Sequence, residues 1–86
     1  MEDISEKESS ALKTYLVVFF NSEGARPSQV NHRLENMGFV PIKGYYDFEY
    51  EWEKNATVVD ALNLADMVHD TLEGMSVYFK LITVEE

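Results

Sequence analysis

Residues 47–53 read DFEYEWE, and this stretch decides the fold because its apolar and acidic residues alternate without a break. A period of two is typical of a β-strand that has one buried face and one exposed face. We therefore expect Phe48, Tyr50 and Trp52 to face the interior and the acidic side chains to face outward. Burial of three aromatic side chains stabilises a fold by roughly 1.5–3 kcal/mol each.

The segments before this strand predict a strand, a helix and a short edge strand. Residues 14–20 (TYLVVFF) are apolar on both alternating faces, which favours an interior strand. After a turn, Pro27 opens a helix. Its apolar stripe consists of Val30, Leu34 and Met37. Residues 39–43 (FVPIK) include Pro41, which cannot donate to a sheet ladder, so we expect that strand at an edge.

The segments after it predict a longer helix and a final strand. Thr57 and Asp60 have the spacing of a capping box, which marks a helix start. The apolar stripe of this helix is expected to consist of Val58, Ala61, Leu62, Ala65, Val68 and Leu72. Residues 75–84 (MSVYFKLITV) form the last strand. Its two faces carry Val77, Phe79 and Leu81, and Tyr78, Lys80 and Ile82.

This β-α-β-β-α-β order predicts an α+β fold, the ferredoxin-like two-layer sandwich with an antiparallel sheet in the order 4-1-3-2. Residues 13–86 form the single domain, and residues 1–12 are expected to be a flexible acidic N-terminal arm. Both helices then cover one face of the sheet and leave the other face open. Two sets of first-strand side chains could lie on that open face: Tyr15, Val17 and Phe19, or Leu16, Val18 and Phe20.

The chain has 86 residues, with seven Lys or Arg against sixteen Asp or Glu, and its formal net charge is −9. This acid excess argues against a broad binding face for nucleic acid or anionic lipid. The absence of cysteine excludes disulfides, thiolate metal sites and cysteine nucleophiles. No apolar run approaches the ~20 residues that cross a bilayer, and the acidic start differs from a signal peptide, so we expect a cytoplasmic protein with no membrane partner.

The open sheet face is the first candidate functional surface. The candidate partner-binding residues on it are Glu49, Glu51, Glu53, Tyr78 and Lys80. Apolar residues of the first strand lie beside these charges, and exposed contiguous apolar area usually marks a partner site. The two interpretations are self-association, through the sheets or their edges, and docking of a basic partner. The carboxylates disfavour single-stranded RNA on this face.

Two further clusters are candidates for small-molecule or metal binding. The loop after the first strand leads into a helix N-terminus, which favours an anion or a ligand carboxylate. The candidate ligand-binding residues there are Asn21, Gly24 and Arg26. Side chains on one face of the second helix could ligate a metal ion. The candidate metal ligands are Asp66, His69 and Asp70. The competing interpretations are an ordinary capped turn and a solvated helix face.

The stretch Phe19–Gly24, followed by Leu34–Phe39 (LENMGF), resembles the first half of ACT-type regulatory domains. The resemblance implies a dimer that binds an amino acid or similar small molecule near Gly24, with Asn21 beside it. The chain also looks like the small CRISPR-associated adaptation protein with a ferredoxin-like fold. Asn21 stands where that family has a metal-binding Asp, which implies that any nuclease activity is lost.

The resulting hypothesis is a non-enzymatic domain, with no catalytic residues and no cofactor, that self-associates and binds a protein partner or a small ligand. The alternative is a small metal-dependent hydrolase or nuclease-like protein. It would use either Glu49 and Glu51 or Asp66, His69 and Asp70. Because the domain is acidic, self-association should strengthen with salt if the glutamates of two copies meet.

Overall fold

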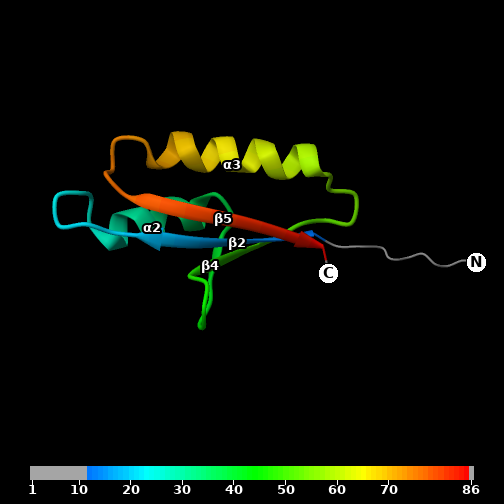
Figure 1. The fold of residues 1–86 in the computed structure, drawn as a ribbon, viewed down its shortest axis with the longest axis horizontal. Coiled ribbons are helices and arrows are strands. Elements are labelled where there is room, and N and C mark those ends of the chain that lie inside the picture. Colours follow the sequence, from blue (N-terminus) through cyan, green and yellow to red (C-terminus); the bar gives the residue numbers. More distant parts are fainter. Residues whose placement is uncertain (1–11, 86) are drawn as a thin grey trace, which may run out of the picture.

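The computed structural model describes residues 12–85, which form four strands and two helices (Figure 1). Within those residues, neither helix is long and apolar enough to cross a membrane. The chain runs in the expected β-α-β-β-α-β order. The elements are β2 (Leu12–Phe19), α2 (Pro27–Asn36), β3 (Val40–Pro41), β4 (Phe48–Glu51), α3 (Val58–Leu72) and β5 (Tyr78–Glu85).

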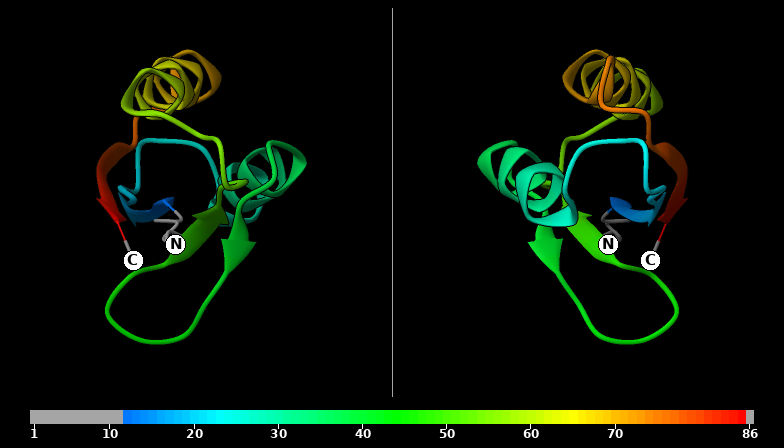
Figure 2. Two further views of the ribbon diagram at one scale, coloured as in Figure 1. Left: turned by 90° about the vertical axis from the view of Figure 1, so that its right-hand side faces the viewer. Right: turned by 90° about the vertical axis from the view of Figure 1, so that its left-hand side faces the viewer.

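The four strands form one antiparallel sheet in the order β3-β4-β2-β5. Numbered along the chain, this is 2-3-1-4 from the β3 edge, or 4-1-3-2 from the β5 edge. The first and third strands are therefore central, and β3 and β5 are the two edges. Both helices lie on the same face of the twisted sheet, as the end-on views in Figure 2 show. The described chain is a small α+β domain with two layers.

The core lies between the helices and the covered sheet face. Its fully buried centre comes from β2 and from both helices, and Phe39 and Phe48 close it beside β3 and β4. The buried apolar residues are Leu16, Val18, Val30, Leu34, Phe39, Phe48, Leu64, Val68, Leu72 and Met75. Tyr50 and Trp52 pack against this cluster, so the three aromatic residues of the alternating stretch face the helices as expected.

A chain of hydrogen bonds crosses the same face of the sheet. The Trp52 indole Nε1–H donates to Thr14 Oγ1 at 2.8 Å, and Thr14 Oγ1 lies 2.7 Å from Thr83 Oγ1. Thr14 is only 1% exposed, so its hydroxyl needs these partners. Strands β4, β2 and β5 are therefore joined by side chains as well as by their ladders.

Local signals explain where the helices begin and end. Thr57 and Asp60 form the expected capping box: Thr57 Oγ1 accepts from the Asp60 backbone N–H, and Asp60 Oδ2 accepts from the Thr57 N–H. Helix α2 begins at Pro27, as predicted. Gly38, with φ at +107°, follows its end, and an added Cβ there would lie 3.1 Å from the Tyr50 ring.

The structure corrects several expected boundaries. The predicted arm, residues 1–12, lies outside the described residues except for Leu12. This residue already belongs to β2 and pairs with Glu85 of β5. Strand β4 is shorter than the alternating stretch, although the Trp52 N–H still donates to the Leu12 carbonyl. Strand β5 begins at Tyr78, because the preceding turn needs Ser76 in the left-handed region, with φ at +56°.

The expected apolar stripe of α3 is wrong at two positions. Leu64, Val68 and Leu72 are the buried residues of this helix. Val58 and Leu62 are 70% and 61% exposed. Helix α3 carries more apolar residues than one face can bury, and two overlapping stripes satisfy the helical period. Packing on the sheet selects the stripe through Leu64 and leaves Val58 and Leu62 on its flank.

Candidate protein-interaction surface

The register of the sheet shows which side chains lie on its uncovered face. Because Thr14, Leu16 and Val18 are buried toward the helices, Tyr15 and its neighbours at alternate positions lie on the other face. Tyr15 is opposite Glu49 on β4 and Ile82 on β5. The first-strand residues of the open face are Lys13, Tyr15, Val17 and Phe19. Of the predicted partner-binding residues, this face gathers Glu49, Glu51, Tyr78 and Lys80, and Glu53 is exposed beyond the end of β4.

The loop between β3 and β4 stands over part of this open face. Figure 2 shows residues 42–47 projecting from the sheet on the side away from the helices. The Tyr46 ring stacks on Tyr15, with centroids 4.6 Å apart, and Tyr45 meets Tyr46 edge-on at 5.1 Å. Asp47 fixes the base of the loop, since its Oδ2 accepts from the Val18 N–H at 2.9 Å. A second flat sheet therefore cannot reach the centre of this face without displacing the loop.

The outer edge of β5 presents unpaired backbone groups. In an antiparallel ladder the N–H and C=O of one residue point to the same side, and alternate residues point to opposite sides. Leu12 and Leu16 accept hydrogen bonds from the β4 side, so the backbone groups of the alternate residues, Lys13, Tyr15, Val17 and Phe19, point to β5. The pairs Lys13–Val84, Tyr15–Ile82, Val17–Lys80 and Phe19–Tyr78 are then the hydrogen-bonded pairs. The outward groups of β5 belong to Phe79, Leu81, Thr83 and Glu85, and in the described part of the chain no strand pairs with them.

The surface along this edge, between β5 and α3, is hollowed at two places, which together we call the groove. Two hollows, of about 410 and 280 Å³, lie at its two ends. The larger hollow is lined by Val58, Leu62 and Ala65 of α3 together with Leu81 and Thr83. The smaller is lined by His69, Leu72 and Glu73 together with Val77 and Phe79. Phe79 and Leu81 are only half-buried, although their side chains face the helix layer. The groove therefore has an apolar floor that one further strand would cover.

The charged groups that line the groove are acidic. Glu85 lines the larger hollow and Glu73 the smaller, and neither hollow has a Lys or Arg in its lining. His69 also lines the smaller hollow. Phe79 and Glu85 are six residues apart along β5, a span of about 20 Å at the rise of a strand. The edge thus has one carboxylate near each end and apolar residues between them.

The loop at Asn21–Arg26 is held in place by its own contacts. The Asn21 amide Nδ2 donates to the Ser76 carbonyl, and its Oδ1 accepts from the Glu23 N–H at 2.8 Å. Gly24 lies against the turn before β5, where an added Cβ would be 2.6 Å from the carbonyl oxygens of Met75 and Ser76. Asn21 and Gly24 therefore fix this loop to the start of β5, and these contacts engage both polar ends of the Asn21 side chain.

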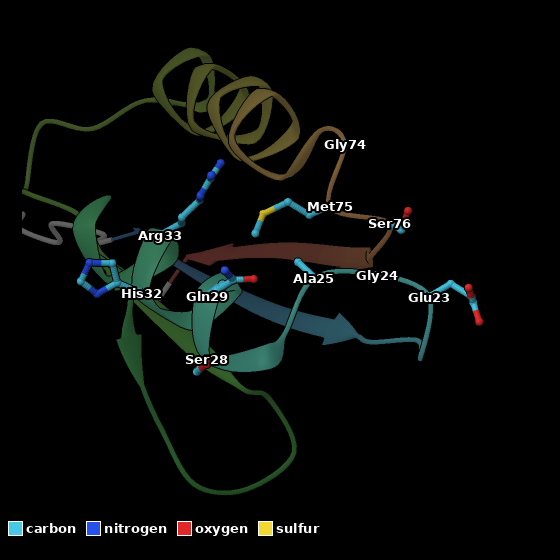
Figure 3. Close-up of a pocket in the computed structure, with 10 residues that line it drawn as sticks. All are labelled: Glu23, Gly24, Ala25, Ser28, Gln29, His32, Arg33, Gly74, Met75 and Ser76. Atoms are coloured by element: carbon cyan, nitrogen blue, oxygen red, sulfur yellow. The ribbon is translucent and has the colours of Figure 1, made fainter.

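A hollow of about 640 Å³ lies beside this loop, between α2 and the turn after α3 (Figure 3). Gly24 lines it, whereas the other two predicted ligand-binding residues, Asn21 and Arg26, are not in its lining. Figure 3 shows that Glu23, Ser28 and His32 point in different directions, so they do not converge on one ligand position. Arg33 Nη1 reaches the Thr71 carbonyl at 3.4 Å, which ties α2 to α3.

The candidate metal ligands are not assembled. His69 and Asp70 are neighbours on α3, with Nδ1 3.4 Å from Oδ1, and their side chains are 68% and 80% exposed. Throughout residues 12–85, no group of three or more His, Cys, Asp or Glu side chains is placed to hold a metal ion. Glu49 and Glu51 lie on the open strand face, and Glu51 also lines a hollow of about 350 Å³ beside the end of β4. The structure therefore does not bring Asp66, His69 and Asp70 together as a metal site.

Sequence reasoning missed the groove and the free edge beside it. Val58 and Leu62 were expected in the core. The partner-binding residues predicted on β5, Tyr78 and Lys80, lie on its other face. One signal was present: α3 has too many apolar residues for one buried stripe, so some had to be exposed. Val58 and Leu62, which are 70% and 61% exposed and line the larger hollow, belong to that second stripe.

The sequence matches no protein-family model, and neither the curated proteins nor the solved structures include a significant match. The resemblances to ACT-type domains and to the CRISPR-associated adaptation protein stay predictions.

Proposed function

We propose that this chain is a non-enzymatic interaction domain with a ferredoxin-like fold, and that it binds a protein partner by adding a strand to β5. One observation carries the proposal. The four outward-facing residues of β5, at alternate positions from Phe79 to Glu85, have unpaired N–H and C=O groups in the described structure. Eight residues without Pro or Gly make an unusually complete template. The absence of cysteine fits a cytoplasmic setting for such a domain.

The apolar groove supports this mode of binding. In strand addition, main-chain hydrogen bonds give affinity and pockets for alternate side chains give specificity. Side chains of an added strand that face the helix layer would cover Phe79 and Leu81 and contact Leu62 on α3. Each Å² of apolar surface that such contacts remove from water stabilises the complex by about 25 cal/mol.

Self-association through the same edge follows from this geometry. Two copies would pair their β5 strands antiparallel about a two-fold axis. An axis near Leu81 or Ile82 places Glu85 of one copy opposite Val77 or Phe79 of the other, beside Glu73. Because this brings carboxylates together twice, we expect weak pairing at low ionic strength that strengthens as salt screens the repulsion.

Amide hydrogen exchange tests the proposal directly. The probe is a neutral, acetylated and amidated strand-forming heptapeptide, Thr-Thr-Val-Thr-Val-Thr-Thr. We expect it to slow exchange at Phe79, Leu81, Thr83 and Glu85, because these N–H groups become donors to the added strand. Unchanged exchange at these four amides, at every peptide concentration up to the millimolar range, would contradict strand addition.

A matched pair of variants separates backbone pairing from side-chain contact. Thr83→Pro removes one outward N–H and should abolish the protection. Thr83→Val keeps that N–H and removes only the hydroxyl bonded to Thr14, so it should leave the protection in place. Equal protection in both variants would show that the backbone edge is not used.

A small ligand in the hollow beside α2 is the second candidate function. The observation that favours it is the polar lining by Ser28, Gln29, His32 and Arg33. Titration with free amino acids, followed by NMR, should shift the Ser28 and His32 amides but leave the β5 amides unchanged. Gly24→Val is not a clean test of this site, because its side chain would collide with the turn before β5. Among the described residues nothing favours the metal-dependent hydrolase.

A further inference from the structure

Resting on strand addition at β5, we infer that the partner segment is basic. It is an extended stretch of about seven residues with a Lys or Arg at each end and apolar residues at the alternate positions between them. The inference combines three features of the edge: the direction of its free amides, the apolar floor of the groove and the two carboxylates near its ends.

The register of an added strand sets the pattern. Residues directly opposite each other in a pair of strands share one face of the sheet. The partner residues opposite Phe79, Leu81, Thr83 and Glu85 therefore face the helix layer, and the residues between them face the other way. Four inward positions at every second residue require a segment of seven residues.

The two ends of the segment meet negative charge. The position opposite Phe79 lies in the hollow that Glu73 lines, and the last inward position lies opposite Glu85. A cation at each position would pair with a carboxylate, whereas an acidic residue there would be repelled. Neither hollow is lined by a Lys or Arg, so the groove offers no permanent positive charge to an acidic partner.

The middle of the segment meets apolar side chains. The inward positions opposite Leu81 and Thr83 lie in the larger hollow, beside Leu62 and Ala65 of α3. Leu62 is 61% exposed in the free chain, so an apolar residue at either position gains contact with it. Small β-branched residues such as Val suit this space because they also favour an extended backbone.

The same charges discriminate against a second copy of the chain. Pairing of β5 with itself brings Glu85 of each copy beside Glu73 of the other, and the sequence provides no cation at the corresponding positions of the edge. A basic segment replaces that repulsion by two ion pairs. Glu73 and Glu85 thus weaken the homodimer by repulsion and favour the basic partner by attraction, so the same two carboxylates act in both ways to give specificity.

The test compares two acetylated and amidated peptides that differ only at their ends: Lys-Thr-Val-Thr-Val-Thr-Lys and Glu-Thr-Val-Thr-Val-Thr-Glu. Binding to the full chain is followed by amide exchange at Phe79, Leu81, Thr83 and Glu85 at neutral pH and about 50 mM salt. We expect the lysine peptide to bind at least tenfold more tightly than the glutamate peptide. Raising the salt to about 500 mM should reduce the difference several-fold because the Debye length shortens.

Charge-neutral variants locate the effect. The double variant Glu73→Gln, Glu85→Gln should lower affinity for the lysine peptide by about fivefold or more, as expected for two exposed ion pairs. The matched control, Glu23→Gln with Glu35→Gln, removes the same charge from the β2–α2 loop and from α2, and should leave affinity unchanged. These are exposed positions, so each variant keeps the fold, and its exchange pattern without peptide verifies this.

The outcomes distinguish this inference from strand addition itself. Equal binding of the lysine, glutamate and neutral peptides would overturn the basic partner and leave strand addition standing. No protection with any peptide would overturn both. Equal weakening by the two double variants would show that the net charge of the chain, and not Glu73 and Glu85, attracts the peptide, and would also overturn the inference. Edge protection that appears at low salt without peptide and rises with protein concentration would assign the edge to a second copy.

Discussion

The two edges of the sheet differ in whether their outward backbone groups can pair with another strand. At β3 the strand has two residues, and the Ile42 N–H donates to the Asp47 carbonyl, so the residue that points outward is Pro41. Proline has no N–H, so this edge cannot donate to another strand. At β5 the strand has eight residues, and its outward positions are Phe79, Leu81, Thr83 and Glu85. One edge is blocked by its sequence and the other is available for pairing.

The difference shows that the ability of a sheet edge to bind a strand depends on which residues occupy its outward-pointing positions. Pro41 blocks its edge because it occupies an outward position, and the same residue at an inward position would break the ladder instead. Protective devices such as Pro, bulges and inward-pointing charges are common on exposed edges. Strand β5 has no proline, and its lysine, Lys80, points to the open face of the sheet.

The largest expected effect comes from proline at an inward position of β5. Ile82→Pro removes an N–H that bonds to Tyr15 on β2, and we expect the free energy of unfolding to fall by roughly 3 kcal/mol. Urea denaturation measures it. Thr83→Pro, one residue away, should cost only about 1 kcal/mol, mainly for the lost hydroxyl contact with Thr14. Equal losses of unfolding free energy in the two variants would refute the assignment of Ile82 to an inward and Thr83 to an outward position.

The next effect concerns the anchor that positions the start of β5. Gly24→Val places a side chain against the Met75 and Ser76 carbonyls, and we expect destabilisation of about 2 kcal/mol. Thermal unfolding measures the loss, with Gly44→Ala as the control for substituting a glycine where space is open. Gly44 has a positive φ, so its alanine variant carries a backbone cost but no collision. A Gly24 variant as stable as the wild type would show that the loop can move away from β5.

A smaller effect is expected where the same anchor loses only its hydrogen bonds. Asn21→Ala removes the amide that donates to the Ser76 carbonyl and the oxygen that accepts from the Glu23 N–H. Because both contacts are exposed, we expect a loss of about 1 kcal/mol. Amide exchange at the beginning of β5 should accelerate in this variant, while exchange in α3 stays the same. Uniform acceleration throughout the domain would indicate a global effect instead of a local anchor.

The smallest effect should come from opening the blocked edge. Pro41→Ala restores an outward N–H that water can satisfy, so we expect stability to change by less than about 0.5 kcal/mol. Exchange at residue 41 should be fast and should stay fast when strand-forming peptides protect β5. Protection at residue 41 by those peptides would show that one N–H is enough to make an edge competent, and the contrast between the two edges would lose its basis.

Much of the fold could be predicted from local signals that do not depend on distant contacts. The alternation at 47–53, the capping box at Thr57 and the proline in β3 each fix an element or its place in the sheet. Thr14–Phe20, by contrast, is apolar on both faces, so its pattern cannot say which set faces the helices. The structure resolves this because Thr14 must bury its hydroxyl against Trp52 and Thr83.

The candidate surface could be predicted only in part, because a free edge is a property of the assembled sheet. The sequence identified the open face and its glutamates Glu49 and Glu51, but not that the loop carrying Tyr46 covers Tyr15. It also placed Leu62 in the core, since helical periodicity allows either of two overlapping stripes. The choice between them depends on how α3 lies across β2 and β5, which no local pattern encodes.

The hydrogen-bonded chain from Trp52 through Thr14 to Thr83 gives the molecule an internal optical reporter. Trp52 is the only tryptophan in the sequence, so the indole emission comes from one known position. Its N–H is two hydrogen bonds away from an edge residue of β5. A ligand that shifts Thr83 when it pairs with the edge should therefore perturb the fluorescence of an indole on the opposite side of β2. The occupancy of the edge can then be followed in the unlabelled protein.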